Sequence, residues 1–150
     1  MKVNLHFEDV SHSADGIPDA ARFQQWAEAA LADEDRASVS LSVRIVDEAE
    51  IQELNQRYRN KAGPTNVLSF PFEDPPGVVS DELGDIVLCA PVVRREAEEQ
   101  GKELTAHWAH LLVHGVLHLC GHDHQADDEA EEMEREEVRI LANLGYPDPY

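Results

Sequence analysis

Basic residues are scarce in this 150-residue chain: 12 lysines and arginines stand against 31 aspartates and glutamates, so the formal net charge is −19. That surplus argues against attraction to nucleic acid through the overall charge. The chain has only two cysteines, Cys89 and Cys120, which excludes a disulfide scaffold and favours a reducing compartment. It also lacks the roughly 20 consecutive apolar residues of a membrane span and the apolar stretch of a signal peptide. We therefore expect a cytoplasmic protein.

Glycine and proline, with 8 residues each, are too few for a collagenous or low-complexity chain, and 42% of the residues are hydrophobic. A folded chain of this length buries roughly 68–70% of the surface that its unfolded form exposes, so it needs no disulfide to hold a core. We expect one domain that covers residues 1–150.

Apolar residues recur with two periodicities along the chain. Alternation with polar residues predicts strands, and recurrence every three or four residues predicts amphipathic helices. Pro18 and Pro91 suit the first position of a helix, whereas Pro71 favours an edge position or the end of a strand. The expected strands lie at residues 2–8, 39–45, 67–72 and 86–88, and the expected helices begin at about residues 18, 47, 91, 105 and 127. This order favours an α+β fold, in which a small mixed four-stranded sheet is packed with about five helices.

Two of these helices carry more specific signals. Asp47 is placed to cap the second helix, and Glu50 three residues later would complete a capping box. The last helix is strongly acidic between Asp127 and Glu137, and we expect these carboxylates on its solvated face. Its buried face would consist of Met133, Ile140, Leu141 and Leu144.

Histidines gather at the end of the fourth expected helix, where five of the 8 lie between His110 and His124. His114 and His118 are four residues apart and share one helix face, and Gly121 then lets the chain turn so that His124 approaches the same point. Three neutral imidazoles with one open position are typical of catalytic zinc sites. The spacing therefore predicts a metal site at the end of this helix, with His114, His118 and His124 as ligands.

The same ligand spacing occurs in the metzincin proteases, whose general-base glutamate directly follows the first histidine. Gly115 occupies that position here, so the pattern keeps the metal and loses the base. Peptide hydrolysis by that mechanism is therefore disfavoured.

Four other residues near the motif have open roles. His107 and His110 lie on or near the helix face of His114, where they either orient a ligand or are ordinary helix residues. His122 also fits the spacing, but its ring should point away if that of His124 points in. Cys120 is a possible soft ligand, although a packed thiol is the more typical state of such a cysteine.

The combined motifs resemble the bacterial YbeY family, the rRNA-maturation endoribonucleases. The segments that carry the resemblance are Asn55–Lys61, Thr65–Phe70, Leu83–Ile86 and the histidine segment His114–His124. The similarity continues through Met133 to Tyr146 and so covers nearly the whole chain.

The resemblance implies a metal-dependent, single-strand-specific endoribonuclease that acts in 3′-end maturation of 16S rRNA and in ribosome quality control. It implies His114, His118 and His124 as ligands of one divalent ion, with Zn²⁺ the expected metal, and Arg59 as the functional arginine that acts with His114 in catalysis. The implied partners are the single-stranded rRNA precursor, the small ribosomal subunit with its proteins, and the GTPase Era.

The residue chemistry agrees with phosphodiester hydrolysis. A zinc ion held by imidazoles lowers the pKa of bound water to about 7 and polarises a phosphoryl oxygen, and the Arg59 guanidinium matches a phosphate. Arg57 and Lys61 would either guide the RNA backbone or serve as exposed solubilising charge. Asp85 and Asp123 are candidate bases with equally good structural roles, in a turn and as a partner of a ligand imidazole. The attacking group, a metal-activated water or the neighbouring ribose hydroxyl, stays open.

Two other functions compete with RNA hydrolysis. The first is a ribosome-associated binding factor with a structural metal, for which a closed fourth coordination position would be typical. The second is a metallohydrolase of small molecules or peptides, whose peptide version is weakened by the missing glutamate.

Overall fold

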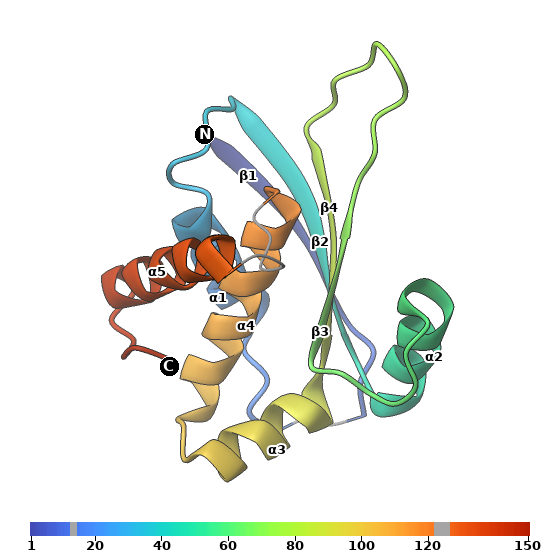
Figure 1. Cartoon of the computed structure of the whole chain (residues 1–150), viewed down its shortest axis with the longest axis vertical. Coiled ribbons are helices and arrows are strands. Elements are labelled where there is room, and N and C mark those ends of the chain that lie inside the picture. The colour runs from blue at the N-terminus through green and yellow to red at the C-terminus, as the bar shows by residue number, and fades with distance from the viewer. Residues whose placement is uncertain (13–14, 122–126) are drawn as a thin grey trace.

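The computed structural model describes residues 1–12, 15–121 and 127–150, and within them it shows an α+β fold with a four-stranded mixed sheet and five helices (Figure 1). The fold class and its element count confirm the sequence prediction. The strands are β1 (Lys2–Asp9), β2 (Ser38–Val46), β3 (Val67–Pro71) and β4 (Glu82–Cys89), and the helices are α1 (Ala20–Ala30), α2 (Glu48–Arg59), α3 (Ala90–Gln100), α4 (Leu104–Leu119) and α5 (Asp127–Asn143).

The sheet has the strand order β1-β2-β4-β3, so β1 and β3 form its two edges. β1, β2 and β4 run parallel, and β3 pairs antiparallel with β4, with Phe70 opposite Asp85 and Pro71 opposite Gly84. Pro71 is the last residue of an edge strand, as predicted, because proline has no N–H to donate to a neighbouring strand.

The two faces of the sheet are covered unequally. α1, α4 and α5 lie on one side of the sheet, and α2 lies on the other (Figure 1). The inward residues of β2, which include Val39, Val43 and Ile45, are completely buried in the larger core. Burying each such side chain contributes about 1.5–3 kcal/mol, which explains why alternation specifies these strands. A smaller apolar cluster under α2 joins Ile51 to Leu68.

Two glycines permit close contacts between α4, β3 and β4. A Cβ on Gly115 of α4 would lie 3.2 Å from the side chains of Ile86 and Ser69. Gly84 in β4 has a φ of +144°, and a Cβ there would collide with the backbone carbonyl of Phe70. Glycine is required at Gly84 on both counts, because side chains rarely adopt this backbone conformation.

The predicted capping box at α2 is wrong. Asp47 does occupy the N-cap position, but its side chain makes no capping hydrogen bond. Its carboxylate instead accepts from the backbone N–H of His12 at 2.9 Å, and the Nδ1 of His12 lies 2.7 Å from the same oxygen. Glu50 binds the Nε of Arg44 at 2.7 Å. Tertiary partners therefore replace the local capping bonds of both residues. The hydrogen bonds from His12 lower the pKa of Asp47.

Among the helices that the structure describes, none is long and apolar enough to cross a membrane. Cys89 and Cys120 are both free thiols.

Candidate active site

The histidine pair of α4 opens into a hollow at the edge of the sheet. The rings of His114 and His118 are one helical turn apart, with centroids separated by 4.8 Å and planes inclined at 74°. Both rings line a cavity of about 520 Å³, and Arg59 lines it as well. We call it the histidine hollow; its lining residues are Tyr58, Arg59, Thr65, Asn66, Val67, Ser69, Phe70, Pro71, His114 and His118.

Arg59 reaches this hollow because α2 ends there. The next residue, Asn60, has a φ of +54° and ends the helix with its N–H bonded to the carbonyl of Gln56 at 3.2 Å. The buried Asn55 side chain then donates to the carbonyl of Gly63 at 3.0 Å. This bond holds the loop that leads into β3. Residues of the last turn of α2 and of the edge strand β3 therefore line the same cavity.

A buried carboxylate lies behind His114. Glu137 of α5 is 0% exposed, and its Oε1 lies 2.5 Å from the Nδ1 of His114. The expectation that the acidic run lies on the solvated face is therefore wrong for this residue. Glu137 follows Met133 by four residues and precedes Ile140 and Leu141 by three and four, so it belongs to the apolar stripe of the helix.

Glu137 is ionised in this setting. Burial raises its pKa, but the polar contacts with His110, His114 and Tyr150 outweigh burial and lower the pKa from 4.5 to about 2. Because an ionised carboxylate only accepts hydrogen bonds, the Nδ1 of His114 donates, and in the neutral form of the ring the Nε2 carries the lone pair. This is the tautomer that a metal-ligating histidine held by a carboxylate adopts.

Two further side chains complete the shell around this carboxylate. The hydroxyl of Tyr150 donates to Glu137 Oε2. His110 places its Nε2 3.7 Å from Glu137 Oε1 and 3.3 Å from the Tyr150 hydroxyl. His110 therefore lies in the shell that supports His114.

His107 is farther from the histidine pair and has a different partner. It is buried, and its Nε2 lies 3.0 Å from Glu96 Oε1. Glu96 also accepts from the side-chain amide of Asn66, a lining residue of the histidine hollow, at 3.0 Å. Burial lowers the pKa of His107, although Glu96 opposes that shift.

The remaining sequence candidates are placed as follows. His122, Asp123 and His124 lie outside the described residues, and among the residues that are described no group of three suited to hold a metal ion is present. Arg57 pairs with Glu53 on the exposed surface of α2 at 3.3 Å. Lys61 is exposed and does not belong to the lining of the hollow, which leaves Arg59 as its lining cation among the described residues.

Asp85 and Cys120 are not part of the histidine hollow either. Asp85 accepts a hydrogen bond from Ser42 on the opposite face of the sheet. Burial, together with a hydrogen bond to Glu34, raises the pKa of Cys120 to about 12, so the thiol stays protonated. A thiol with this burial and pKa is a packed cysteine, the more typical state predicted from the sequence.

Gly115 faces the sheet, because a Cβ added to it would lie 3.2 Å from the side chains of Ile86 and Ser69. A glutamate at this position, where a metzincin protease has its base, would have to enter that packed contact. The glycine is therefore explained by helix-on-sheet packing.

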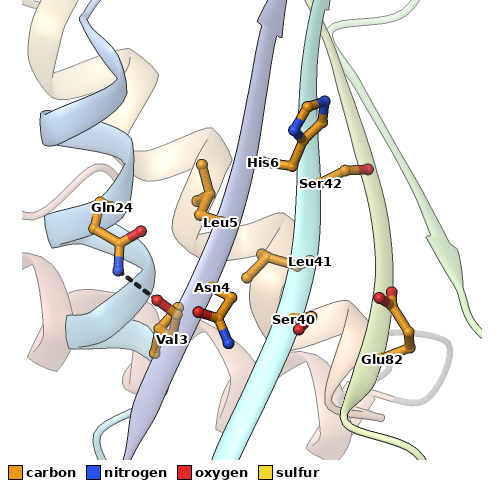
Figure 2. Close-up of a pocket in the computed structure, with 9 residues that line it drawn as sticks. All are labelled: Val3, Asn4, Leu5, His6, Gln24, Ser40, Leu41, Ser42 and Glu82. Carbon is orange, nitrogen blue, oxygen red and sulfur yellow. Dashed lines mark hydrogen bonds between the residues drawn. The ribbon is translucent and has the colours of Figure 1, made fainter.

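A second hollow lies near the N-terminal end of β1 (Figure 2). It is lined by Val3, Asn4, Leu5, His6, Gln24, Ser40, Leu41, Ser42 and Glu82, and Gln24 donates there to the carbonyl of Val3 at 2.8 Å. The described lining holds one histidine and one carboxylate. We therefore take the histidine hollow as the candidate active site.

Two comparisons with known proteins give the same family, and a third finds a solved structure with a similar fold. A family model described as Endoribonuclease YbeY matches residues 8–145. The Endoribonuclease YbeY of Methylococcus capsulatus (strain ATCC 33009 / NCIMB 11132 / Bath) is 56% identical over 148 residues, which cover 99% of this chain and 95% of that protein. The solution structure of TM1509 from Thermotoga maritima matches with a TM-score of 0.61 and 25% identity, over 94% of this chain and 91% of that one.

Proposed function

Since this chain belongs to the YbeY endoribonuclease family, we propose that it is a metal-dependent, single-strand-specific endoribonuclease that acts in 3′-end maturation of 16S rRNA and in ribosome quality control. The observation that carries the metal-dependent part is the convergence of His114, His118 and Arg59 in one hollow, with the ionised Glu137 behind His114.

The donor chemistry fits one zinc ion. His114 and His118 supply two imidazoles from one helix face, and the bond to Glu137 sets the Nε2 of His114 as its lone-pair nitrogen. His124 would be the third ligand. When bound, zinc supplies a Lewis acid for the phosphate and activates water at neutral pH.

The chain's own groups bind and orient the RNA. The Arg59 guanidinium donates two parallel hydrogen bonds to phosphate oxygens and stabilises the charge that develops on them. Glu137 keeps the His114 ring in one orientation and holds the proton on its Nδ1 throughout. The hydroxyl of Ser69 is engaged with the carbonyl of Gly115 at 3.3 Å, which fixes the wall between β3 and α4.

The formal net charge of −19 repels a polyanion, so the chain alone binds RNA weakly and partners increase the delivery of the RNA. We propose that the small ribosomal subunit and its proteins, with the GTPase Era, bring the precursor to the site. Arg59 then provides local attraction at the cavity itself.

The test is a cleavage time course on end-labelled single-stranded and duplex RNA, with the zinc-loaded wild-type protein and His114→Ala purified side by side. We expect only the wild type to cut, and to cut the single strand. Equal cutting by both proteins would indicate a contaminating nuclease and contradict the proposal. If neither protein cuts, a ribosome-associated binding factor with a structural metal becomes the better hypothesis.

A further inference from the structure

An aromatic pair, made of the exposed Tyr58 and the half-buried Phe70, forms one rim of the histidine hollow. The ring of Tyr58, in the last turn of α2, meets the ring of Phe70 in β3 edge-to-face, with centroids 5.3 Å apart. Tyr58 is 60% exposed, so much of its side chain stays open to a further partner. Its position in the chain is next to Arg59.

The same pair also lines another cavity, on the face of the sheet that carries α2. We call it the sheet-face hollow; its lining residues are Ser42, Arg44, Glu50, Leu54, Tyr58, Phe70, Asp85 and Val87. Tyr58 and Phe70 belong to both linings, so the aromatic pair forms the ridge between the two hollows.

The two hollows differ in charge. Among its described lining residues the histidine hollow has Arg59 and no carboxylate. The sheet-face hollow has the carboxylates of Glu50 and Asp85, and its Arg44 is already bound to Glu50 and Glu8. A phosphate is therefore attracted to the histidine hollow and repelled from the sheet-face hollow. An uncharged group with a flat apolar face suits the sheet-face hollow.

We propose that Tyr58 and Phe70 form a nucleobase-binding subsite, on which an unpaired base of the RNA stacks while Arg59 holds an adjacent phosphate. This inference rests on the proposed endoribonuclease function and deepens it. A nucleotide joins a charged phosphate to a neutral flat base, and the ridge separates a cationic hollow from an acidic one in the same way. Stacking on aromatic side chains tolerates any base, because every base has a π-face.

The subsite also gives a physical reason for a preference for single strands. A base in a duplex is paired and stacked, so it reaches Tyr58 only after an unstacking cost of a few kcal/mol. An unpaired base stacks on the ridge without that cost. The position of the ridge is fixed on both sides, because Asn55 anchors the end of α2 and Phe70 pairs with Asp85 in the sheet.

The experiment removes one partner at a time. A set of single-stranded RNAs, each with one base replaced by an abasic ribose, is cleaved by the zinc-loaded full chain and by Tyr58→Ala, Tyr58→Leu and Tyr58→Phe. For the wild type and Tyr58→Phe we expect one abasic position to lower kcat/KM about 10-fold. For Tyr58→Ala and Tyr58→Leu, cleavage of the intact RNA falls by a similar factor and the abasic change at that position has less than about a 2-fold further effect.

Leucine keeps apolar bulk and lacks the π-face, so equal behaviour of Tyr58→Leu and the wild type would overturn the subsite. So would an abasic effect of the same size in Tyr58→Ala and in the wild type. Thermal unfolding of each variant checks the fold, and a 60% exposed side chain should change stability little. Failure of the wild type to cut any RNA would overturn the proposed function itself, whereas cutting that ignores every abasic position would overturn only the subsite.

Discussion

Replacing Glu137 by glutamine tests whether the buried carboxylate organises the histidine site. Glutamine keeps the volume of the side chain but replaces one acceptor oxygen by an NH₂ donor. His114 and Tyr150 both donate to the carboxylate, and the His110 ring lies beside it. In the variant the amide oxygen still accepts from His114, but the NH₂ faces the Tyr150 hydroxyl, which must turn from donor to acceptor. Loss of these hydrogen bonds to a charged group costs about 1.5–3 kcal/mol.

The pKa of Glu137 gives a second measure of the same contribution. A pKa lowered from 4.5 to about 2 corresponds to about 3 kcal/mol of stability at neutral pH. Because the pKa is lower in the folded state, this stability is fully present above pH 4.5 and is lost as the pH falls toward 2. We expect the free energy of unfolding of Glu137→Gln to be about 2–3 kcal/mol lower than that of the wild type at pH 7. This difference should narrow below pH 4.5.

Two assays separate a structural role from a positioning role. Urea unfolding in excess chelator measures the contribution of the chain's own contacts, and zinc titration of the folded protein measures the metal affinity. Loss of a carboxylate that orients a ligand histidine typically weakens the metal site 10- to 100-fold. Glu132→Gln is the matched control, because it removes the same charge from an exposed position of the same helix.

Equal stability and equal zinc affinity of Glu137→Gln and Glu132→Gln would refute the reasoning from burial and hydrogen bonding. A loss of stability without any loss of zinc affinity would show that Glu137 only holds α5 against α4.

Three other predictions test the site and its support. Arg59→Glu should lower the rate of RNA cleavage by at least about 100-fold, while Arg57→Glu, on the same helix end but outside the hollow, should retain most of it. Gly84→Ala should lower the free energy of unfolding in urea by about 2–5 kcal/mol, because its Cβ is strained by the positive φ and also collides with backbone. Gly101→Ala has a positive φ but open space around it, so the loss should be about 1 kcal/mol. The folded-state pKa of His107 is lowered, so the unfolded chain binds that proton more tightly and stability falls as the pH drops through 6.5. His107→Gln should therefore lose less stability than the wild type between pH 7 and 5, and an unchanged pH dependence would contradict this assignment.

Local periodicity was sufficient for most of the fold. The strand at residues 39–45 is predictable because alternate side chains enter one core, and the structure buries Val39 and Val43 completely. Pro71 marks an edge because its missing N–H is a property of the residue itself. The pairing of His114 with His118 follows from helix geometry alone.

Tertiary partners explain what periodicity missed. The Asp47 side chain binds His12, which lies 35 positions away, instead of capping α2. No local sequence pattern reports this distant partner. The ridge at Tyr58 and Phe70 exists because the sheet order places β3 at an edge beside the end of α2. Strand order is a global property, so the local pattern of the segment Arg57–Lys61 does not report which of its basic residues lines the hollow.

The burial of Glu137 could be predicted from its spacing in the sequence, but the acidic composition of α5 obscures that spacing. A net charge of −19 makes every carboxylate of α5 look like part of a solvated surface. Yet its spacing from Met133 and Ile140 places Glu137 in the apolar stripe, where a carboxylate stays buried only if donors meet it. The donors are the Nδ1 of His114, on a neighbouring helix that is rich in histidine, and the hydroxyl of Tyr150. An acidic residue at an apolar position of one helix, combined with histidines spaced along one face of the preceding helix, therefore predicts a supported metal ligand before any fold is known.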